Sequence, residues 1–271
     1  MESTVFLPPL APLKPYQIAA GLALARMTAM MLVMPAFTGL GVTGTVRAGI
    51  ALVLALPVIP LVAQSVPSLD LTPGTVAMLM VKEAAVGAAI GLVLGVPLWA
   101  AGAAGEILDL QRGASLATLT DPSNSNETSV TGTLFTLTML ALFFVSGGMA
   151  VALRVIYDSY ALWPATATLP QLGPTTGLVL LRLLDDIVAL GLKLVIPLMA
   201  CLLVADVVVA LLSKAAPNLN VFDLSFGVKN LLFTVLIVLY CAFLVSYMKA
   251  DLALFDGMSR RLESIARPPT P

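Results

Sequence analysis

The chain has 271 residues, of which 59% are hydrophobic and only 11% are charged, and its mean hydropathy is +1.01. So little polar material cannot cover a soluble globule, and the composition predicts an all-α, polytopic membrane protein. The near balance of 14 Lys and Arg against 15 Asp and Glu, without a dense basic run, argues against nucleic acid as a partner, and the absence of histidine argues against metal sites, cofactors and enzymatic chemistry.

Six hydrophobic segments follow one another in a single helical membrane domain, each long enough to cross a bilayer at about 20 residues per crossing. Pro57 and Pro60 must kink or end the second segment, because proline removes a backbone donor. The third and fifth segments are too long for one simple crossing and could be broken helices. A tail at 249–271 is amphipathic at first and then disordered. The six segments are 16–37, 45–64, 75–105, 130–156, 178–213 and 226–248.

Three charged residues lie well inside these apolar segments, namely Arg26, Lys193 and Asp206. A charge near the middle of a lipid-facing helix costs roughly 2.5 to 3.5 kcal/mol on insertion scales, so each of them needs a partner in protein or water. Asp186 and Lys193 fall on nearly one helix face and can both point into an interface. Two interpretations stay open, a structural ion pair between neighbouring helices or part of a proton or ion path.

Gly87, Gly91 and Gly95 recur at every fourth residue of the third segment and line one helix face. Such a stripe lets another backbone approach closely, and the contacting helix could belong to this chain or to another. The charged residues Lys82 and Glu83 lie early in the same segment. A chain that buries several charges and a glycine face is most readily stabilised inside a larger assembly, so we expect obligate partners.

The composition changes abruptly between residues 105 and 129. Glu106, Asp109 and Arg112 lie at successive i, i+3 positions, so they can pair along one helix face, and Gly113 then offers a C-cap. Small side chains and an Asp121-Pro122 turn follow. This loop is long for a simple connection, and long ordered loops often carry function.

Two blocks of sequence resemble the signature of the SctT/FliR family, also named SpaR, YscT and HrcT. The first block reads Asp109-Leu-Gln-Arg-Gly-Ala-Ser-Leu-Ala, then Thr120-Asp-Pro, Glu127-Thr-Ser and Gly132. The second reads Ala216-Pro-Asn-Leu-Asn-Val-Phe-Asp-Leu-Ser-Phe-Gly-Val-Lys229. Their order and separation fit the family, and the hydrophobic layout matches it nearly end to end. The Arg112-Gly-Ala-Ser form looks closer to the injectisome branch than to the flagellar one.

The resemblance implies a pore-forming, non-enzymatic component of the type III secretion export apparatus in the bacterial inner membrane, with a role in virulence or host interaction. One copy would join SctR-type and SctS-type subunits in a helical channel complex that passes unfolded secretion substrates. It would also contact the SctU-type switch protein and the SctV-type export gate. The loop at 113–126 would correspond to the family's channel plug, which includes Gly113, Ala114, Ser115, Leu116, Ala117, Asp121 and Pro122.

The second block is interpreted as a packing or assembly element. Asn218 and Asn220 can satisfy the backbone of a turn, and Phe222 can anchor the connection between two helices. Lys229 ends the block and is grouped with these assembly residues.

A small secondary transporter or ion-coupled permease is the alternative. It takes Pro97 and Pro197 as helix breaks and uses Asp186, Lys193 and Asp206 as charges at the membrane midplane. It fits the composition equally well, but it does not predict the loop signature. The export component is therefore the first prediction.

Overall fold

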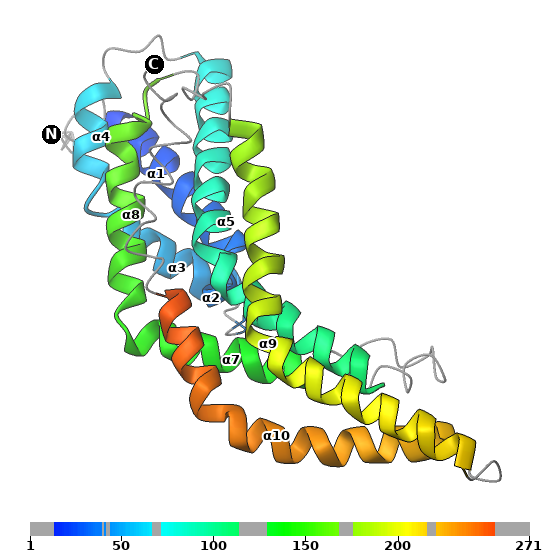
Figure 1. Cartoon of the computed structure of the whole chain (residues 1–271). Helices are drawn as coiled ribbons and strands as arrows, with labels where there is room; N and C mark the ends of the chain where they lie inside the picture. The colour runs from blue at the N-terminus through cyan, green and yellow to red at the C-terminus, as the bar shows by residue number, and fades with distance from the viewer. Residues whose placement is uncertain are drawn as a thin grey trace, which may run out of the picture. The chain divides into compact units, whose positions relative to one another are not determined.

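The computed structural model describes residues 14–39, 41, 44–66, 72–113, 129–167, 176–215 and 221–252 (Figure 1). Within these ranges the chain forms helices and no strand, which confirms the predicted all-α fold class. The helices are α1 (Lys14–Val33), α2 (Pro35–Thr38), α3 (Gly44–Ala55), α4 (Ile59–Ser65), α5 (Pro73–Arg112), α7 (Val130–Val145), α8 (Gly148–Leu162), α9 (Thr176–Ala215) and α10 (Val221–Leu252).

Four of these helices, α1, α5, α9 and α10, are long and apolar enough to cross a membrane. Two bent pairs, α3 with α4 and α7 with α8, meet the same requirement when each pair is taken as one span. The described residues therefore contain four to six candidate spans. The predicted multi-pass membrane protein is confirmed at this level.

The expected interruption of the second segment is present. Helix α3 ends at Ala55, two residues before Pro57, and α4 begins at Ile59 with Pro60 in its first turn, where a missing N–H leaves no helical hydrogen bond unmade. The two helices meet at an angle of 65°. This break follows directly from the proline chemistry.

The prolines of the third and fifth segments do not break their helices. Pro97 lies inside α5 and Pro197 lies inside α9, and each helix runs through its proline for a total of 40 residues. A proline in a helix removes one hydrogen bond, whereas breaking the helix among apolar side chains would expose many more polar backbone groups. Treating these two prolines as helix breaks, as the transporter alternative does, is therefore wrong.

The chain divides into two compact units. Unit 1 comprises Met1–Gly95, Ala150–Val179 and Asp256–Pro271, and unit 2 comprises Val96–Met149 and Leu180–Phe255. Helix α5 contributes its first part to unit 1 and its last part to unit 2.

Unit 1 is built around α1, which packs against α3 and α4 (Figure 1). Helix α1 also runs parallel to the first part of α5, because Gly21 lies against Met80 and Gly91 lies against Met30. A Cβ atom added at Gly87 would overlap the backbone carbonyl of Arg26. The helix that contacts the glycine stripe at Gly87 and Gly91 is thus α1 of the same chain, and Gly95, on the same face, is buried.

Unit 2 contains an antiparallel hairpin made by the end of α5 and the start of α7. The two backbones touch where Gly105 faces Gly132, since a Cβ atom added at Gly105 would overlap the Gly132 backbone. Helices α9 and α10 are also antiparallel, because their ion pairs join Asp206 to Lys229 and Lys193 to Asp251. The hairpin brings together the end of α5, where the predicted plug loop begins, and Ser129, three residues after that loop.

Candidate functional site

Of the predicted plug loop at 113–126, only Gly113 lies within the described part of the chain, which resumes at Ser129, three residues after the loop. Gly113 follows the last residue of α5 with a φ of 81°, a left-handed conformation that glycine adopts without a steric penalty. Ser129 is the N-cap of α7. The predicted plug residues outside the described ranges are Ala114, Ser115, Leu116, Ala117, Asp121 and Pro122.

One buried carboxylate, that of Asp109, joins the two sides of the loop. Its Oδ2 accepts hydrogen bonds from the Ser129 hydroxyl at 2.6 Å and from the Thr131 backbone N–H at 3.1 Å. Its Oδ1 accepts from the Thr131 hydroxyl at 2.5 Å and from Arg112 Nε at 3.0 Å. The Asp109 side chain is only 4% exposed. We call these four residues, Asp109, Arg112, Ser129 and Thr131, the loop anchor.

Ser129 caps α7 while it contacts the loop anchor's carboxylate. Its hydroxyl oxygen accepts from the Gly132 backbone N–H at 2.8 Å and donates to Asp109. The negative charge of Asp109 therefore lies at the N-terminus of α7, where unpaired N–H groups and the helix dipole favour an anion. The start of α7 and the end of α5 are fastened by the same group.

Basic and aromatic side chains of α10 hold the last turn of α5. Lys229 Nζ donates to the carbonyl of Gln111 at 3.0 Å and lies 2.8 Å from the Asp206 carboxylate. The Arg112 guanidinium lies over the Phe233 ring, 4.4 Å from its centroid. The first and second signature blocks, far apart in sequence, therefore meet at Lys229.

The remaining predicted residues of the loop and the second block lie elsewhere. Arg112 and Asp109 pair at 2.7 Å, as their spacing predicts, but Glu106 is exposed and takes part in no ion pair seen among the described residues. Asn218 and Asn220 lie outside the described ranges. Phe222 belongs to the first turn of α10, and the described structure does not include its side chain.

Unit 1 holds a second polar group of residues, which we call the buried charge cluster. It consists of Arg26, Lys82, Glu83 and Ser159 together with the carbonyls that they contact. Arg26 binds both oxygens of Glu83, Nε to Oε2 at 2.6 Å and Nη2 to Oε1 at 2.9 Å. Its Nη1 donates to the Ser159 hydroxyl at 2.9 Å, and its Nη2 also donates to the Trp163 carbonyl at 2.8 Å. The cluster therefore joins α1, α5 and the end of α8.

Lys82 completes the cluster. Its Nζ lies 2.7 Å from Glu83 Oε1 and donates to the carbonyls of Pro164 and Ala165 at 2.8 and 3.0 Å. The side chains of Arg26 and Glu83 are fully buried, and that of Lys82 is 4% exposed. Every donor of the lysine thus has an acceptor, as a buried ammonium group requires.

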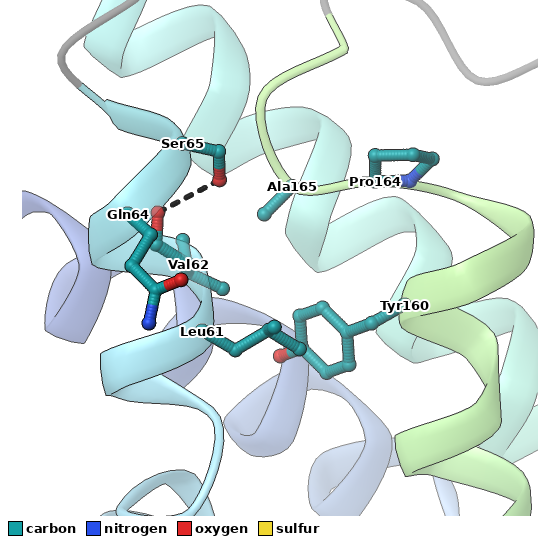
Figure 2. Close-up of a pocket in the computed structure, with 7 residues that line it drawn as sticks. All are labelled: Leu61, Val62, Gln64, Ser65, Tyr160, Pro164 and Ala165. Atoms are coloured by element: carbon teal, nitrogen blue, oxygen red, sulfur yellow. Dashed lines mark hydrogen bonds between the residues drawn. The ribbon is translucent and has the colours of Figure 1, made fainter.

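A cavity of about 380 Å³ lies beside this cluster, between α4 and the end of α8 (Figure 2). Figure 2 shows the Tyr160 ring reaching from α8 toward Leu61 on α4. The Arg26 guanidinium lies 3.8 Å from the centroid of that ring, whereas the Tyr160 hydroxyl has no hydrogen-bond partner among the described residues. Tyr160 therefore contributes to the cluster through its ring face.

The charges expected to need partners all have them. Arg26 pairs with Glu83, Asp206 pairs with Lys229, and Lys193 lies 3.4 Å from Asp251. Asp186, predicted to share a face with Lys193, is half-buried in α9. The carboxylate that pairs with Lys193 thus comes from α10, across the antiparallel helix pair.

Sequence reasoning did not single out Thr131, Ser159 or Asp251, and it included Ser129 only as a member of the first signature block, without a role of its own. The three hydroxyl residues carry no charge and belong to no repeated spacing in the sequence. Only their hydrogen bonds in the folded chain show that they contribute to the two polar groups. Asp251 falls in the predicted tail, but α10 continues to Leu252 and buries it. Within the described ranges no group of three or more His, Cys, Asp or Glu residues could hold a metal ion.

Comparison with known proteins identifies the family. The family described as "Bacterial export proteins, family 1" matches residues 18–254. This chain belongs to that family. The SctT/FliR resemblance read from the two sequence blocks is therefore confirmed, and the chain is a membrane protein of type III secretion and protein export.

Three relatives indicate the branch of the family. The chain is 34% identical to Yop proteins translocation protein T of Yersinia pestis over 240 residues, which cover 88% of this chain and 92% of that protein. It is 30% identical to Surface presentation of antigens protein SpaR of Salmonella typhimurium over 226 residues, 82% of each chain. It is 28% identical to Flagellar biosynthetic protein FliR of Escherichia coli over 204 residues, 75% of this chain and 76% of FliR. The higher identities to the first two favour the injectisome branch.

Proposed function

We propose that this chain is a pore-forming component of a type III export channel in the bacterial inner membrane and that residues 113–126 plug the channel between substrates. The observation that carries the proposal is the loop anchor. A single buried carboxylate, Asp109, binds residues on both sides of the loop. A plug needs fixed ends, because a loop with fixed ends can be displaced by a substrate and return to the same place.

The anchor also limits how far the loop can move. When both ends are held together, the tip reaches at most half the extended length of residues 114–128, about 25 Å at roughly 3.4 Å per residue. The loop is rich in small and polar side chains, such as Ala114, Ser115 and Ala117, so displacing it uncovers little apolar area.

The exposed surface of unit 2 supports an assembly. Large apolar side chains on α10 remain uncovered, including Leu231 and Val238, each 71% exposed, and Leu239, 70% exposed. Lipid or other subunits must cover them. We propose that one copy of this chain packs with SctR-type and SctS-type subunits, contacts SctU-type and SctV-type proteins, and passes unfolded substrates. No catalytic step is part of this role.

The transporter alternative has weaker support. It relied on proline breaks at Pro97 and Pro197 and on Asp186, Lys193 and Asp206 as midplane charges. Both prolines lie inside continuous helices, and Lys193 and Asp206 each have an oppositely charged partner. Ion pairs between α9 and α10 support a packing role for Lys193 and Asp206 over a proton or ion path.

The plug is tested by removing the loop from the native complex. We expect deletion of residues 114–126 to raise the leakage of ions and small solutes through membranes that contain the assembled apparatus, while the complex still assembles. The matched control replaces the same residues by an equal length of Gly and Ser, which keeps the tether but removes the native side chains. An intact complex whose permeability does not change on deletion would contradict the plug.

A further inference from the structure

The last turn of α5 is held by one face of α10. Lys229 and Phe233 are four residues apart and share that face. They contact consecutive residues of α5, the Gln111 carbonyl at 3.0 Å from Lys229 Nζ and the Arg112 guanidinium at 4.4 Å from the Phe233 centroid. The contacts fall on the turn that leads into the loop.

The Lys229 contact replaces a hydrogen bond that the helix itself cannot supply. The last four carbonyls of a helix have no intrahelical partner, and a cation near them is favoured by the helix dipole. In α5 the Leu110 carbonyl accepts from the Gly113 backbone N–H at 3.1 Å, and the Gln111 carbonyl accepts from Lys229. The Lys229 side chain is only 15% exposed, so this contact is shielded from water.

A second contact ties the same turn to α9. The Gln111 side-chain amide donates to the Met199 carbonyl at 3.2 Å. Lys229 in turn pairs with Asp206 of α9, which also accepts from the Ser225 hydroxyl at 3.3 Å. Gln111 is thus held by both helices of the α9 and α10 pair, and Lys229 is the residue that touches both α5 and α9.

From this turn the contacts continue into the loop anchor. Arg112, which rests on Phe233, donates to Asp109, and Asp109 binds Ser129 and Thr131 on the far side of the loop. An unbroken series of contacts therefore joins Lys229 and Phe233 on α10 to residues on both sides of the loop. Such a series is a physical route for coupling, and mutational cycles can measure the coupling.

We propose that Lys229 is a positioning residue that sets the place of the loop anchor from α10, through the Gln111 carbonyl, so that a displacement of α10 is transmitted to both ends of the loop. This inference rests on the proposed function for its leakage readout. The role belongs to the bond with α5. The ion pair with Asp206 orients the ammonium group, and it does not by itself fix the loop.

Charge exchange separates two contacts of Lys229, the hydrogen bond to the Gln111 carbonyl and the ion pair with Asp206. Lys229→Met removes both the bond to Gln111 and the ion pair. The double exchange Asp206→Lys with Lys229→Asp restores an ion pair between α9 and α10 but supplies no donor from position 229 to the Gln111 carbonyl. Lys249→Met, which changes an exposed lysine of the same helix, is the matched control.

The experiment measures solute leakage and assembly of the full complex, together with the labelling rate of a cysteine placed by Ser115→Cys after Cys201 and Cys241 are replaced by Ala. We expect Lys229→Met to raise the leak and the labelling rate about tenfold, the ratio that corresponds to about 1.4 kcal/mol. The double exchange should stay as leaky as Lys229→Met, and Lys249→Met should match the parent. A double exchange that restores parental values would overturn the proposal, since the ion pair alone would then suffice.

The two readouts keep the inference separate from the plug. If deletion of residues 114–126 leaves the membrane tight while Lys229→Met still raises labelling at position 115, the plug fails and the positioning role stands. If deletion causes a leak but Lys229→Met changes neither leak nor labelling in an assembled complex, the positioning role fails and the plug stands.

A mutational cycle tests the coupling itself. The effects of Lys229→Met and Asp109→Asn on the leak should be non-additive, and additive effects would contradict the coupling.

Discussion

The buried charge cluster of unit 1 and the loop anchor of unit 2 use similar chemistry in different settings. Each places a carboxylate among basic and hydroxyl groups, Glu83 with Arg26 in the first and Asp109 with Arg112 in the second. Glu83 pairs with Arg26 on α1 and with its neighbour Lys82 on α5, so its charge joins two helices that are packed together in unit 1. The partners of Asp109 lie at two helix ends that border a loop. The comparison teaches that similar side chains can join two packed helices in one unit and the two sides of a loop in the other, so the position of the partners separates the packing role from the proposed role at the loop.

The largest expected effect comes from removing the charge of Glu83. Glu83→Gln leaves Arg26 and Lys82 buried without a carboxylate, and breaking a buried ion pair in this way costs about 3 to 5 kcal/mol. We expect a strongly lowered thermal unfolding temperature and poor accumulation in membranes. Glu106→Gln is the control, because Glu106 is an exposed glutamate of the same helix. If the two variants were equally stable, the claim that the buried charge cluster stabilises unit 1 would be contradicted.

A smaller effect on stability and a larger effect on leakage are expected at Asp109. Asp109→Asn keeps the size of the side chain and some of its hydrogen bonds to Ser129 and Thr131 but loses the charge that Arg112 pairs with, at a cost of about 1 to 2 kcal/mol. The chain should still assemble, and membrane leakage should rise. Thermal unfolding and solute flux on the same sample provide the measurement. An Asp109→Asn complex with the lowered unfolding temperature of Glu83→Gln and with unchanged solute flux would contradict the role of Asp109 at the loop. It would indicate a packing role instead.

The smallest effects distinguish two tyrosines of α8 in unit 1. The Tyr157 hydroxyl donates to the Leu54 carbonyl at 3.0 Å, whereas the Tyr160 hydroxyl has no partner among the described residues. Tyr157→Phe should therefore destabilise the protein by about 1 kcal/mol, and Tyr160→Phe should be neutral or slightly stabilising, since the ring that faces Arg26 remains. Thermal unfolding of both variants tests this order. A loss of stability confined to Tyr160→Phe would show that its hydroxyl binds a group outside the described residues.

The candidate site was predictable from sequence only in part. The ion pair between Asp109 and Arg112 and the end of the helix at Gly113 were both predicted from sequence and are both present. They were predictable because i, i+3 spacing and a terminal glycine act locally. The role of Ser129 and Thr131 could not be read in this way, since they are 20 and 22 residues from Asp109 and reach it only when α5 and α7 fold into a hairpin. Lys229 was recognised as part of a motif, but its acceptor, Gln111, lies 118 residues away.

The sequence by itself determined the class of the protein, the interruption at Pro57 and membership of the export family. Hydropathy, proline chemistry and short signature blocks are local properties, and they do not depend on how the chain packs. The tertiary structure alone decided that α1 covers the glycine stripe, that α5 and α9 continue through their prolines, and that Lys193 pairs with Asp251. These outcomes depend on residues far apart in the chain. The cost of burying a charge or a backbone group is fixed by the sequence, but the group that offsets it is chosen only when the helices pack.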